Sequence, residues 1–416
     1  MTTTTVRPLH EIALLSQAER FKGRPKLCSD CGICGGELRP KMAQSCVFVN
    51  NKHEELELKL HGRNRRDGDE LLFGISRAIH VIRMRPVNYE AQWSGVITTM
   101  GALLLEQGLV EGVICTHAAP GTRWAPLPVL ARTPEEVRAS AGNKPCISPN
   151  LEILDQVRAS GLKRIAFIGT GCQVHALRAL EDELGLERLY VIGLPCTDNT
   201  SYPDLLRFLK IASKSPDTVV HQEFMQDFRV WFRHENGTIE KVNFVDLDVS
   251  GLGGERAMFP AACMSCFDYQ NGLTDLTVGY LGAPLPPEER WQWMFVRTER
   301  GEELFELLRP HLELGTYSEG GNRRPGIKAY IGMLRRPKVR PAAPIRKFVA
   351  WMQRTKGPKG LEFARSVIEQ KLLRNLVFVR DLHGRLEGRI VPGYVYRALE
   401  YTAEVYEQEF ERPLKR

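Results

Sequence analysis

Three closely spaced cysteines near the N-terminus dictate how that part of the chain can fold. Cys28, Cys31 and Cys34 stand at the spacing C-x-x-C-x-x-C, and Cys46 follows after eleven further residues. Three thiolates at this spacing wrap a short loop around one metal centre, as in iron–sulfur proteins. Structural zinc, the alternative, normally takes two separated cysteine pairs. We therefore expect residues 1–70, which lack long periodic stretches, to be organised by an iron–sulfur cluster.

Four further cysteines form a second candidate set. Cys263 and Cys266 make a C-x-x-C pair, whereas Cys172 in GTGCQ and Cys196 in LPCTDN each follow an apolar, strand-like run. Ligands and cofactors gather where parallel strands end, so the four thiols are candidates for a second cluster. Each single cysteine is otherwise a small buried side chain, and a thioredoxin-like redox pair is the weaker alternative for Cys263 and Cys266.

The middle of the chain predicts an α/β fold. A strand over 164–168, a glycine-containing turn, a helical stretch and a second strand over 189–194 indicate parallel strands joined by a helix. A helix is expected over 96–107, and alternation around Asn236-Gly237 predicts a hairpin. We expect a mixed sheet built from such units, followed by helices near 361–374 and 393–409 in a basic C-terminal region.

Composition and charge narrow the class of protein. The 416 residues are 43% hydrophobic and 26% charged, typical of a folded chain with several packed units. No run of about 18 apolar residues exists to span a membrane, and the N-terminus lacks the layout of a secretory signal or a transit peptide. We expect a cytoplasmic protein whose ten cysteines stay reduced.

Positive charge is concentrated near the C-terminal end. The net charge is +7, but residues 320–361 hold twelve Lys and Arg and no acid, which leaves 7 − 12 = −5 for the rest. Such a tract indicates a partner. Its apolar residues Phe348, Val349, Trp351 and Met352 suit an anionic membrane, and its charge suits an acidic protein. The cysteines lack zinc-finger spacing and the tract lacks regularly interleaved aromatics, so we expect no nucleic acid partner.

Several strings, in this order, resemble a known family. They are CSDCGIC, AQWSGVITTM, NKPCISPNL, GTGCQVHALR, LPCTDN, EFMQDF, CMSCFDY and VGYLGAP. From about Cys28 to Arg374 the chain resembles the iron–sulfur flavoproteins related to the beta subunit of the deazaflavin-reducing hydrogenases. The resemblance implies one FAD and two 4Fe–4S clusters. It implies that Cys172, Cys196, Cys263 and Cys266 hold one cluster, and that Cys28, Cys31, Cys34 and Cys46 hold the other.

The resemblance also implies where FAD binds and how the chain is divided. The positions that match the flavin-contacting motifs are Trp93, Ser94, Gly95, Val96, Thr98, Asn143, Lys144, Ser148, Asn150, Thr170, Gly279 and Gly282. The expected units are the iron–sulfur segment (1–70), two halves of a catalytic core (71–165 and 166–318), and a basic tract with C-terminal helices (319–416).

Within the family, the chain is most similar to ferredoxin-dependent reductases of the 8-vinyl group of divinyl chlorophyllide, and 7-hydroxymethyl chlorophyll a reductases are near relatives. The resemblance implies reduced ferredoxin as donor and a tetrapyrrole as substrate. A departure from the family, the extra residues 285–290, puts the substrate in doubt because that loop is expected to border its pocket. Reduction of the 7-hydroxymethyl group or of a deazaflavin, and a role as an electron-relay subunit, stay open.

The residues that would meet the substrate are less well indicated. The candidates for the proton donor are His221, two residues before the string EFMQDF, and Asp227 within it, and a paired position at a strand edge explains them equally well. Aromatic and apolar side chains suit the walls of a flat pigment pocket, although each is more often plain core. The candidates are Trp93, Phe224, Met225, Trp291 and Trp293.

Overall fold

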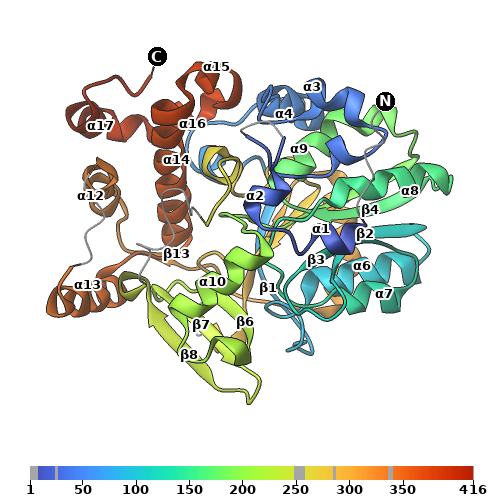
Figure 1. Cartoon of the computed structure of the whole chain (residues 1–416), viewed down its shortest axis with the longest axis horizontal. Coiled ribbons are helices and arrows are strands. Elements are labelled where there is room, and N and C mark those ends of the chain that lie inside the picture. Colours follow the sequence, from blue (N-terminus) through green and yellow to red (C-terminus); the bar gives the residue numbers. More distant parts are fainter. Residues whose placement is uncertain (1–7, 24–26, 248–257, 284–286, 336–340, 416) are drawn as a thin grey trace.

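The computed structural model describes residues 8–23, 27–247, 258–283, 287–335 and 341–415 (Figure 1). Its centre is an eight-stranded mixed sheet with the strand order β11-β1-β10-β9-β5-β4-β2-β3. The strands, in that order, are Leu312–Leu314, Ala78–Met84, Gln292–Val296, Leu276–Gly279, Arg188–Gly193, Arg164–Gly169, Gly112–Ala118 and Pro126–Ala131. The expected mixed α/β architecture is confirmed.

The parallel part of the sheet is the part that the sequence predicts best. Strands β2, β4, β5 and β9 run parallel, with Ile165 opposite Leu189 in the β4–β5 pair. Helix α9 (Gly171–Leu180) connects β4 to β5, as the strand–turn–helix–strand pattern predicts. The side chain of Gln173 accepts a hydrogen bond from the backbone N–H of Thr170 at 3.0 Å, which fixes the start of this helix.

Helices cover both faces of the sheet, and the alternation of buried side chains shows why. Val113 and Ile192 pack with helices α6 (Val96–Glu106) and α11 (Glu299–Leu308) on one face. Their sequence neighbours Ile114 and Val191 pack on the opposite face. Successive side chains of a strand point to opposite faces, so strands covered on both sides are apolar throughout. The opposite face is covered by α8 (Ile153–Ala159) and α9.

Where the structure describes the N-terminal segment, its helices are short. The longest, α4 (His53–His61), has nine residues; the others are α1 (Leu9–Ile12), α2 (Gln17–Arg20), α3 (Met42–Ser45) and α5 (Asp69–Phe73). This agrees with the absence of long periodic stretches. Leu27 and Phe48 of the segment join the same apolar cluster as the C-terminal helices, so the segment is packed onto the body of the molecule.

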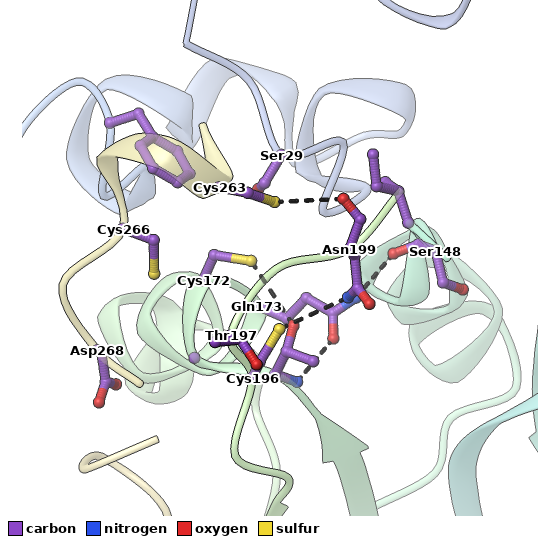
Figure 2. A pocket seen from close by; sticks show the side chains of 14 residues that line it. Ser29, Ser148, Cys172, Gln173, Cys196, Thr197, Asn199, Cys263, Cys266 and Asp268 are labelled. Atoms are coloured by element: carbon purple, nitrogen blue, oxygen red, sulfur yellow. Dashed lines mark hydrogen bonds between the residues drawn. The ribbon is translucent and has the colours of Figure 1, made fainter. Parts of the chain in front are cut away.

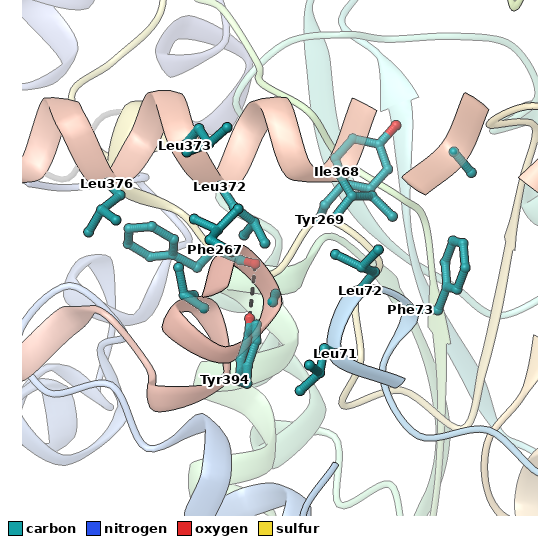
Figure 3. Close-up of a cluster of buried hydrophobic side chains, with 14 of the residues drawn as sticks. Leu71, Leu72, Phe73, Phe267, Tyr269, Ile368, Leu372, Leu373, Leu376 and Tyr394 are labelled. Carbon is teal, nitrogen blue, oxygen red and sulfur yellow. Dashed lines mark hydrogen bonds between the residues drawn. The ribbon is translucent and has the colours of Figure 1, made fainter. Parts of the chain in front are cut away.

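The C-terminal region is helical, as expected, and crosses the body of the molecule. Helix α14 (Leu361–His383) packs Ile368 and Leu372 against α5 and against Phe267 (Figure 3). The expected helix over 393–409 is divided into α16 (Gly393–Leu399) and α17 (Ala403–Phe410). The Thr402 hydroxyl donates to the Leu399 carbonyl at 2.6 Å, and such a local bond competes with the helical ladder. The remaining helices here are α12 (Arg324–Arg335), α13 (Ala343–Lys356) and α15 (Glu387–Ile390).

A small antiparallel sheet lies beside the main one. It consists of β6 (Val219–Phe224), β7 (Arg229–His234) and β8 (Ile239–Asn243), and helix α10 (Tyr202–Ala212) precedes it. The expected hairpin at Asn236-Gly237 joins β7 to β8, and Gly237 has a φ of +81°. The remaining helix is α7 (Pro134–Ala139), and the remaining strands are β12 (Glu319–Gly320) and β13 (Lys359–Gly360).

Two expectations concern residues that are not described. Residues 284–286 of the extended loop, and Arg336, Lys338 and Arg340 of the basic tract, lie outside the described residues. Across the part of the chain that the structure describes, no helix combines the length and apolar character needed to cross a membrane.

Candidate functional site

Four of the predicted cysteine ligands line one cavity (Figure 2). Cys172 lies in the first turn of α9 after β4, Cys196 follows β5, and Cys263 and Cys266 bracket a single 3-10 turn. The cavity has about 40 Å³, more than one water requires. Burial raises the pKa of the Cys263 and Cys266 thiols to about 12. A bound metal centre would displace these protons, because thiolates are the form that binds metal.

The N-terminal cysteines form a second, adjoining set. Burial raises the pKa of the Cys46 thiol to about 11, and Cys28 and Cys34 add to this rise. Burial also raises the pKa of Cys31 well above its usual value, with contributions from Cys172, Cys46 and Cys28. Ser29 and Phe48, which lie close to Cys28 and Cys46 in the sequence, line the same cavity as Cys172, so the two sets neighbour each other.

The donor chemistry of both sets suits iron–sulfur clusters, which are held by four cysteine thiolates. Among the described residues, no three His, Cys, Asp or Glu side chains are close enough together to hold a single metal ion. A cluster of several irons carries its ligands on its outside, further apart than the ligands of one ion.

Helix α14 supplies contacts that the sequence did not indicate. The Asn375 side chain, fully buried, donates to the Cys263 carbonyl at 3.1 Å and to the Cys266 carbonyl at 2.6 Å. The Lys371 ammonium is 2% exposed, donates to the Thr197 carbonyl, and lies 3.4 Å from the Asp198 carboxylate. A buried positive charge therefore lies beside the second cysteine set. Helical periodicity revealed α14 itself but carried no signal for this contact.

A buried histidine connects the two sets. His175 on α9 accepts from the Lys52 N–H at 3.0 Å and donates to the Ser45 carbonyl at 3.1 Å. Burial lowers the pKa of His175 to about 4, so its ring is neutral. It thereby holds the loop before Cys46 against the helix that carries Cys172.

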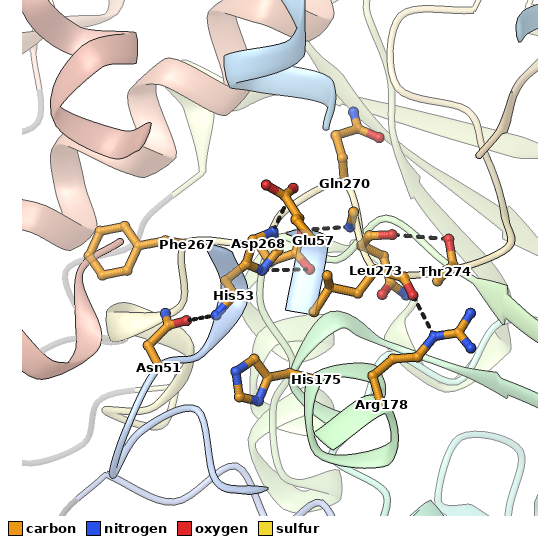
Figure 4. Close-up of polar contacts among 12 residues, drawn as sticks. Asn51, His53, Glu57, His175, Arg178, Phe267, Asp268, Gln270, Leu273 and Thr274 are labelled. Carbon is orange, nitrogen blue, oxygen red and sulfur yellow. Dashed lines mark hydrogen bonds and ion pairs between the residues drawn. The ribbon is translucent and has the colours of Figure 1, made fainter. Parts of the chain in front are cut away.

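A buried ionic network adjoins this histidine (Figure 4). The Glu57 carboxylate accepts from Arg65 Nε at 2.6 Å and lies 3.1 Å from His53 Nε2. Burial opposes the ionised form, but Arg65 and His53 outweigh it and lower the pKa of Glu57 to about 2. The network fixes α4 against the centre of the molecule.

The first group of predicted flavin residues lies in the turn before α6 and in its first turn. Gly95 precedes the helix with a φ of +90°, Val96 and Thr98 follow, and no side chain caps the first helical N–H groups. The Ser94 hydroxyl is already engaged, because it accepts from the Met84 N–H at 3.1 Å and from the Gln292 amide at 2.6 Å.

Two other loops lie against this turn. The Trp93 ring stacks on Tyr280, with centroids 3.9 Å apart and planes 3° apart, and Tyr280 stands between Gly279 and Gly282. A Cβ at Gly142 would lie 3.8 Å from the Glu90 carbonyl oxygen, so the loop that carries Asn143 and Lys144 also approaches. Three segments far apart in the sequence thus approach one another.

Individual side chains in these loops have structural partners. The Lys144 ammonium donates to the carbonyls of Ser140, Ala141 and Gly142 at 2.9, 3.0 and 3.2 Å, and burial lowers its pKa to about 8. It closes the C-terminal end of α7. Asn143 Oδ1, by contrast, is buried and accepts no hydrogen bond from any described residue, so it is available to a ligand.

The two glycines predicted near the flavin also serve packing. A Cβ at Gly279 would overlap Pro195, and one at Gly282 would overlap the Gly360 carbonyl at the start of α14. Gly282 also has a φ of +73°, which disfavours other residues.

The remaining flavin candidates join the cysteine cavity. Ser148 donates to Asn150 at 2.5 Å, and the Ser148 carbonyl accepts from Gln173 at 2.7 Å. Ser148 and Thr170 line the same cavity as the four cysteines. The expected flavin site and the expected second cluster site therefore share a boundary.

The candidate proton donors lie in the small sheet. His221 Nε2 is 2.8 Å from Glu223 Oε1. Asp227 accepts from the backbone N–H and Nε of Arg229 and from Trp231 Nε1, at 2.8 to 3.1 Å. Next to Asp227, the N–H of Gln226 donates to the Tyr280 hydroxyl at 3.0 Å, which places this hairpin beside the Trp93 stack.

The candidate wall residues divide into two groups. One side chain, Phe224, is 54% exposed, and the others are buried in the cluster that also contains Tyr280. The buried ones are Trp93, Met225, Trp291 and Trp293.

Two neighbouring sets of four cysteines, one of them at the ends of parallel strands, offer the ligands of iron–sulfur clusters, so fold and site together indicate a redox protein. The models of the N- and C-terminal parts of the coenzyme F420 hydrogenase/dehydrogenase beta subunit match residues 82–155 and 162–319. The chain belongs to this family of oxidoreductases.

Individual proteins are also similar in sequence to this chain. The chloroplastic 7-hydroxymethyl chlorophyll a reductase of Oryza sativa is 40% identical over 389 residues, which are 90% of this chain and 82% of that protein. An uncharacterised protein of Nostoc sp. is 42% identical over 93% of this chain and 96% of its own length. The coenzyme F420 hydrogenase subunit beta of Methanococcus voltae is 30% identical over 51% of this chain and 73% of its own length.

One solved structure shares the fold. A chain of the F420-reducing [NiFe] hydrogenase complex from Methanosarcina barkeri superposes with a TM-score of 0.52 at 22% identity, covering 69% of this chain and 91% of that one. The family models end at residue 319, so helix α14, which contacts the cysteine cavity, lies beyond them.

Proposed function

We propose that the protein is a ferredoxin-dependent reductase of a chlorophyll-type tetrapyrrole that carries one FAD and two 4Fe–4S clusters. The reaction we assign first is reduction of the 8-vinyl group of divinyl chlorophyllide, or of its protochlorophyllide counterpart, to ethyl. It adds two electrons and two protons across one carbon–carbon double bond. The observation that carries the proposal is the cavity that brings Cys172, Cys196, Cys263 and Cys266 together beside the N-terminal set.

Each set of residues has a distinct role in this proposal. The four cysteines of the cavity hold one cluster, and Cys28, Cys31, Cys34 and Cys46 hold the other. When bound, the clusters supply single-electron transfer from ferredoxin and FAD supplies hydride transfer. Asn143 Oδ1, buried without a partner among the described residues, and the uncapped start of α6 after Gly95 are suited to receive the flavin.

Reduction of the pigment also requires a proton donor among the protein side chains. Arg229 and Trp231 hold the Asp227 carboxylate at the hairpin next to Tyr280. We retain Asp227 and His221 as the candidate donors. Replacement of either by a non-ionisable residue (Asp227→Asn or His221→Gln) should slow pigment reduction in a single turnover without changing the bound flavin. A rate equal to that of the unchanged protein removes that residue from consideration.

A second reaction has specific support. The rice relative, named a 7-hydroxymethyl chlorophyll a reductase, is 40% identical over 90% of this chain. Reductive removal of that hydroxyl also consumes two electrons and two protons, and it releases water. The same cofactors would serve both reactions, so the pocket around the pigment decides between them.

Two measurements test the proposal. Protein purified without oxygen should contain about eight irons and one flavin per chain, as two four-iron clusters and FAD require. Cys263→Ala should lose about half of this iron, whereas Cys115→Ala, which removes a buried thiol outside both sets, should lose none. Zinc in place of iron, without flavin, would refute the cofactor assignment.

The substrate is tested with reduced ferredoxin and each pigment in turn. Conversion of divinyl chlorophyllide to its ethyl product supports the first reaction, and conversion of only the 7-hydroxymethyl pigment selects the second. Loaded protein that oxidises ferredoxin but reduces neither pigment would instead be an electron-relay subunit or a deazaflavin reductase.

A further inference from the structure

Helix α13 (Ala343–Lys356) lies at the margin of the molecule (Figure 1). One of its faces is apolar and exposed to solvent. Its large apolar side chains Ile345, Phe348, Trp351 and Met352 are 55%, 61%, 49% and 38% exposed. The spacings of three and four residues place them on one side of the helix. The Phe348 and Trp351 rings lie 6.0 Å apart. Together these four side chains form what we call the α13 stripe.

The opposite side of α13 is polar and faces the protein. Arg346 Nε pairs with the Asp246 carboxylate at 2.8 Å, and Arg354 donates to the Asn243 side chain at 2.7 Å. Ala350 is the one buried residue of this helix. A surface helix of a globular protein normally buries its apolar side and exposes its polar side. Helix α13 does the reverse, so the α13 stripe is exposed although polar residues of the same helix are turned inward.

Lysines border the stripe on both sides. At about 100° per residue, Lys347 and Lys356 fall on opposite edges of the apolar face, and both are exposed. They belong to the tract of twelve Lys and Arg without an acid over residues 320–361. An apolar centre with aromatic rings and a basic border is the pattern of helices that lie in the boundary between lipid headgroups and acyl chains.

We propose that helix α13 docks the protein on a membrane surface that contains anionic lipid. The apolar stripe would enter the acyl boundary while Lys347 and Lys356 meet the headgroup charge. An acidic protein fits less well, because Arg346 and Arg354 are turned inward and the centre of the outward face is uncharged. A second copy placed face to face would bring two acid-free basic tracts together, and like charges repel. This inference does not depend on the identity of the substrate.

The test is sedimentation of the complete, cofactor-loaded protein with vesicles of phosphatidylglycerol and phosphatidylcholine, compared with phosphatidylcholine alone. We expect binding only to the anionic vesicles, weakened by salt. The double variant Phe348→Gln, Trp351→Gln should bind on the order of tenfold more weakly, because it removes apolar area that would be buried. The control Leu314→Gln, Leu382→Gln removes exposed apolar side chains elsewhere and should bind normally.

Other outcomes would overturn the proposal. Failure to bind anionic vesicles at low salt would do so directly. A lower molecular mass of the stripe variant in sedimentation velocity without lipid would show that a second copy covers the stripe. A loss of ferredoxin affinity with lipid binding unchanged would assign the surface to an acidic protein. If the stripe variant does not fold, Lys347→Glu, Lys356→Glu tests the same surface, and we expect it to lose binding.

Discussion

Asn375 is the residue through which α14 should hold the second cysteine set in place. Its side chain is fully buried and donates to the carbonyls of Cys263 and Cys266, 112 and 109 residues away in the sequence. Asn375→Ala leaves both acceptors without this donor. The Cys263 carbonyl keeps the Cys266 N–H at 3.4 Å and the Lys371 ammonium at 3.5 Å as donors. The Cys266 carbonyl loses its donor, and an acceptor left unsatisfied in this way costs roughly 1–3 kcal/mol, so the substitution should cost about 1–3 kcal/mol.

Two measurements check this expectation on the cofactor-loaded protein. The midpoint of chemical unfolding should fall, and iron should be lost faster on exposure to a chelator. The matched control is Gln370→Ala on the same helix, whose side chain, among the described residues, donates only to Ser366 one turn away. It should change the free energy of unfolding by less than about 0.5 kcal/mol, as is usual away from buried networks. Equal midpoints and equal iron loss for the two variants would refute the role assigned to Asn375.

Three further predictions follow from the same contacts. Lys371→Met removes a buried positive charge beside the second cysteine set and should lower the reduction potential of one cluster by on the order of 59 mV, a tenfold change in its reduction equilibrium. An EPR-monitored redox titration in which both clusters keep the reduction potentials of the unchanged protein contradicts this. Because the pKa of Glu57 is lowered from 4.5 to about 2, the stability that its carboxylate contributes is complete above pH 4.5 and is lost as the pH falls towards 2. Unfolding midpoints measured across this pH range should fall more steeply for the unchanged protein than for Glu57→Gln. Gly282→Ala places a methyl group on the Gly360 carbonyl and should abolish soluble protein, whereas Gly326→Ala, with open space around it, should raise the melting temperature slightly.

Much of the central sheet could be read from local pattern. The β4–α9–β5 unit follows from apolar strands around a glycine-containing turn, and its parallel pairing is as expected. The same logic placed Cys172 and Cys196 at neighbouring strand ends. The interruption at Thr402 was not predicted, because helical periodicity continues across it while a side-chain hydrogen bond ends the ladder.

The candidate site was only partly predictable. The resemblance of the motifs to a known family identified segments that the structure brings together around Trp93 and Tyr280. It gave no reason to expect that Lys144 would close the end of α7. A lysine's role depends on which carbonyls surround it after folding, and sequence spacing does not report this.

The sequence by itself determined the chemistry that this protein can hold: two sets of four cysteines, an α/β core and a basic tract near the C-terminal end. Only the tertiary structure decided that the two sets adjoin, that Lys371 and Asn375 reach the second set, and that α13 turns its apolar side outward. The physical reason is the separation along the chain over which each kind of information acts. Periodicity and spacing are set by neighbours in the chain, whereas these features depend on contacts between segments more than a hundred residues apart or on which side of a helix packs.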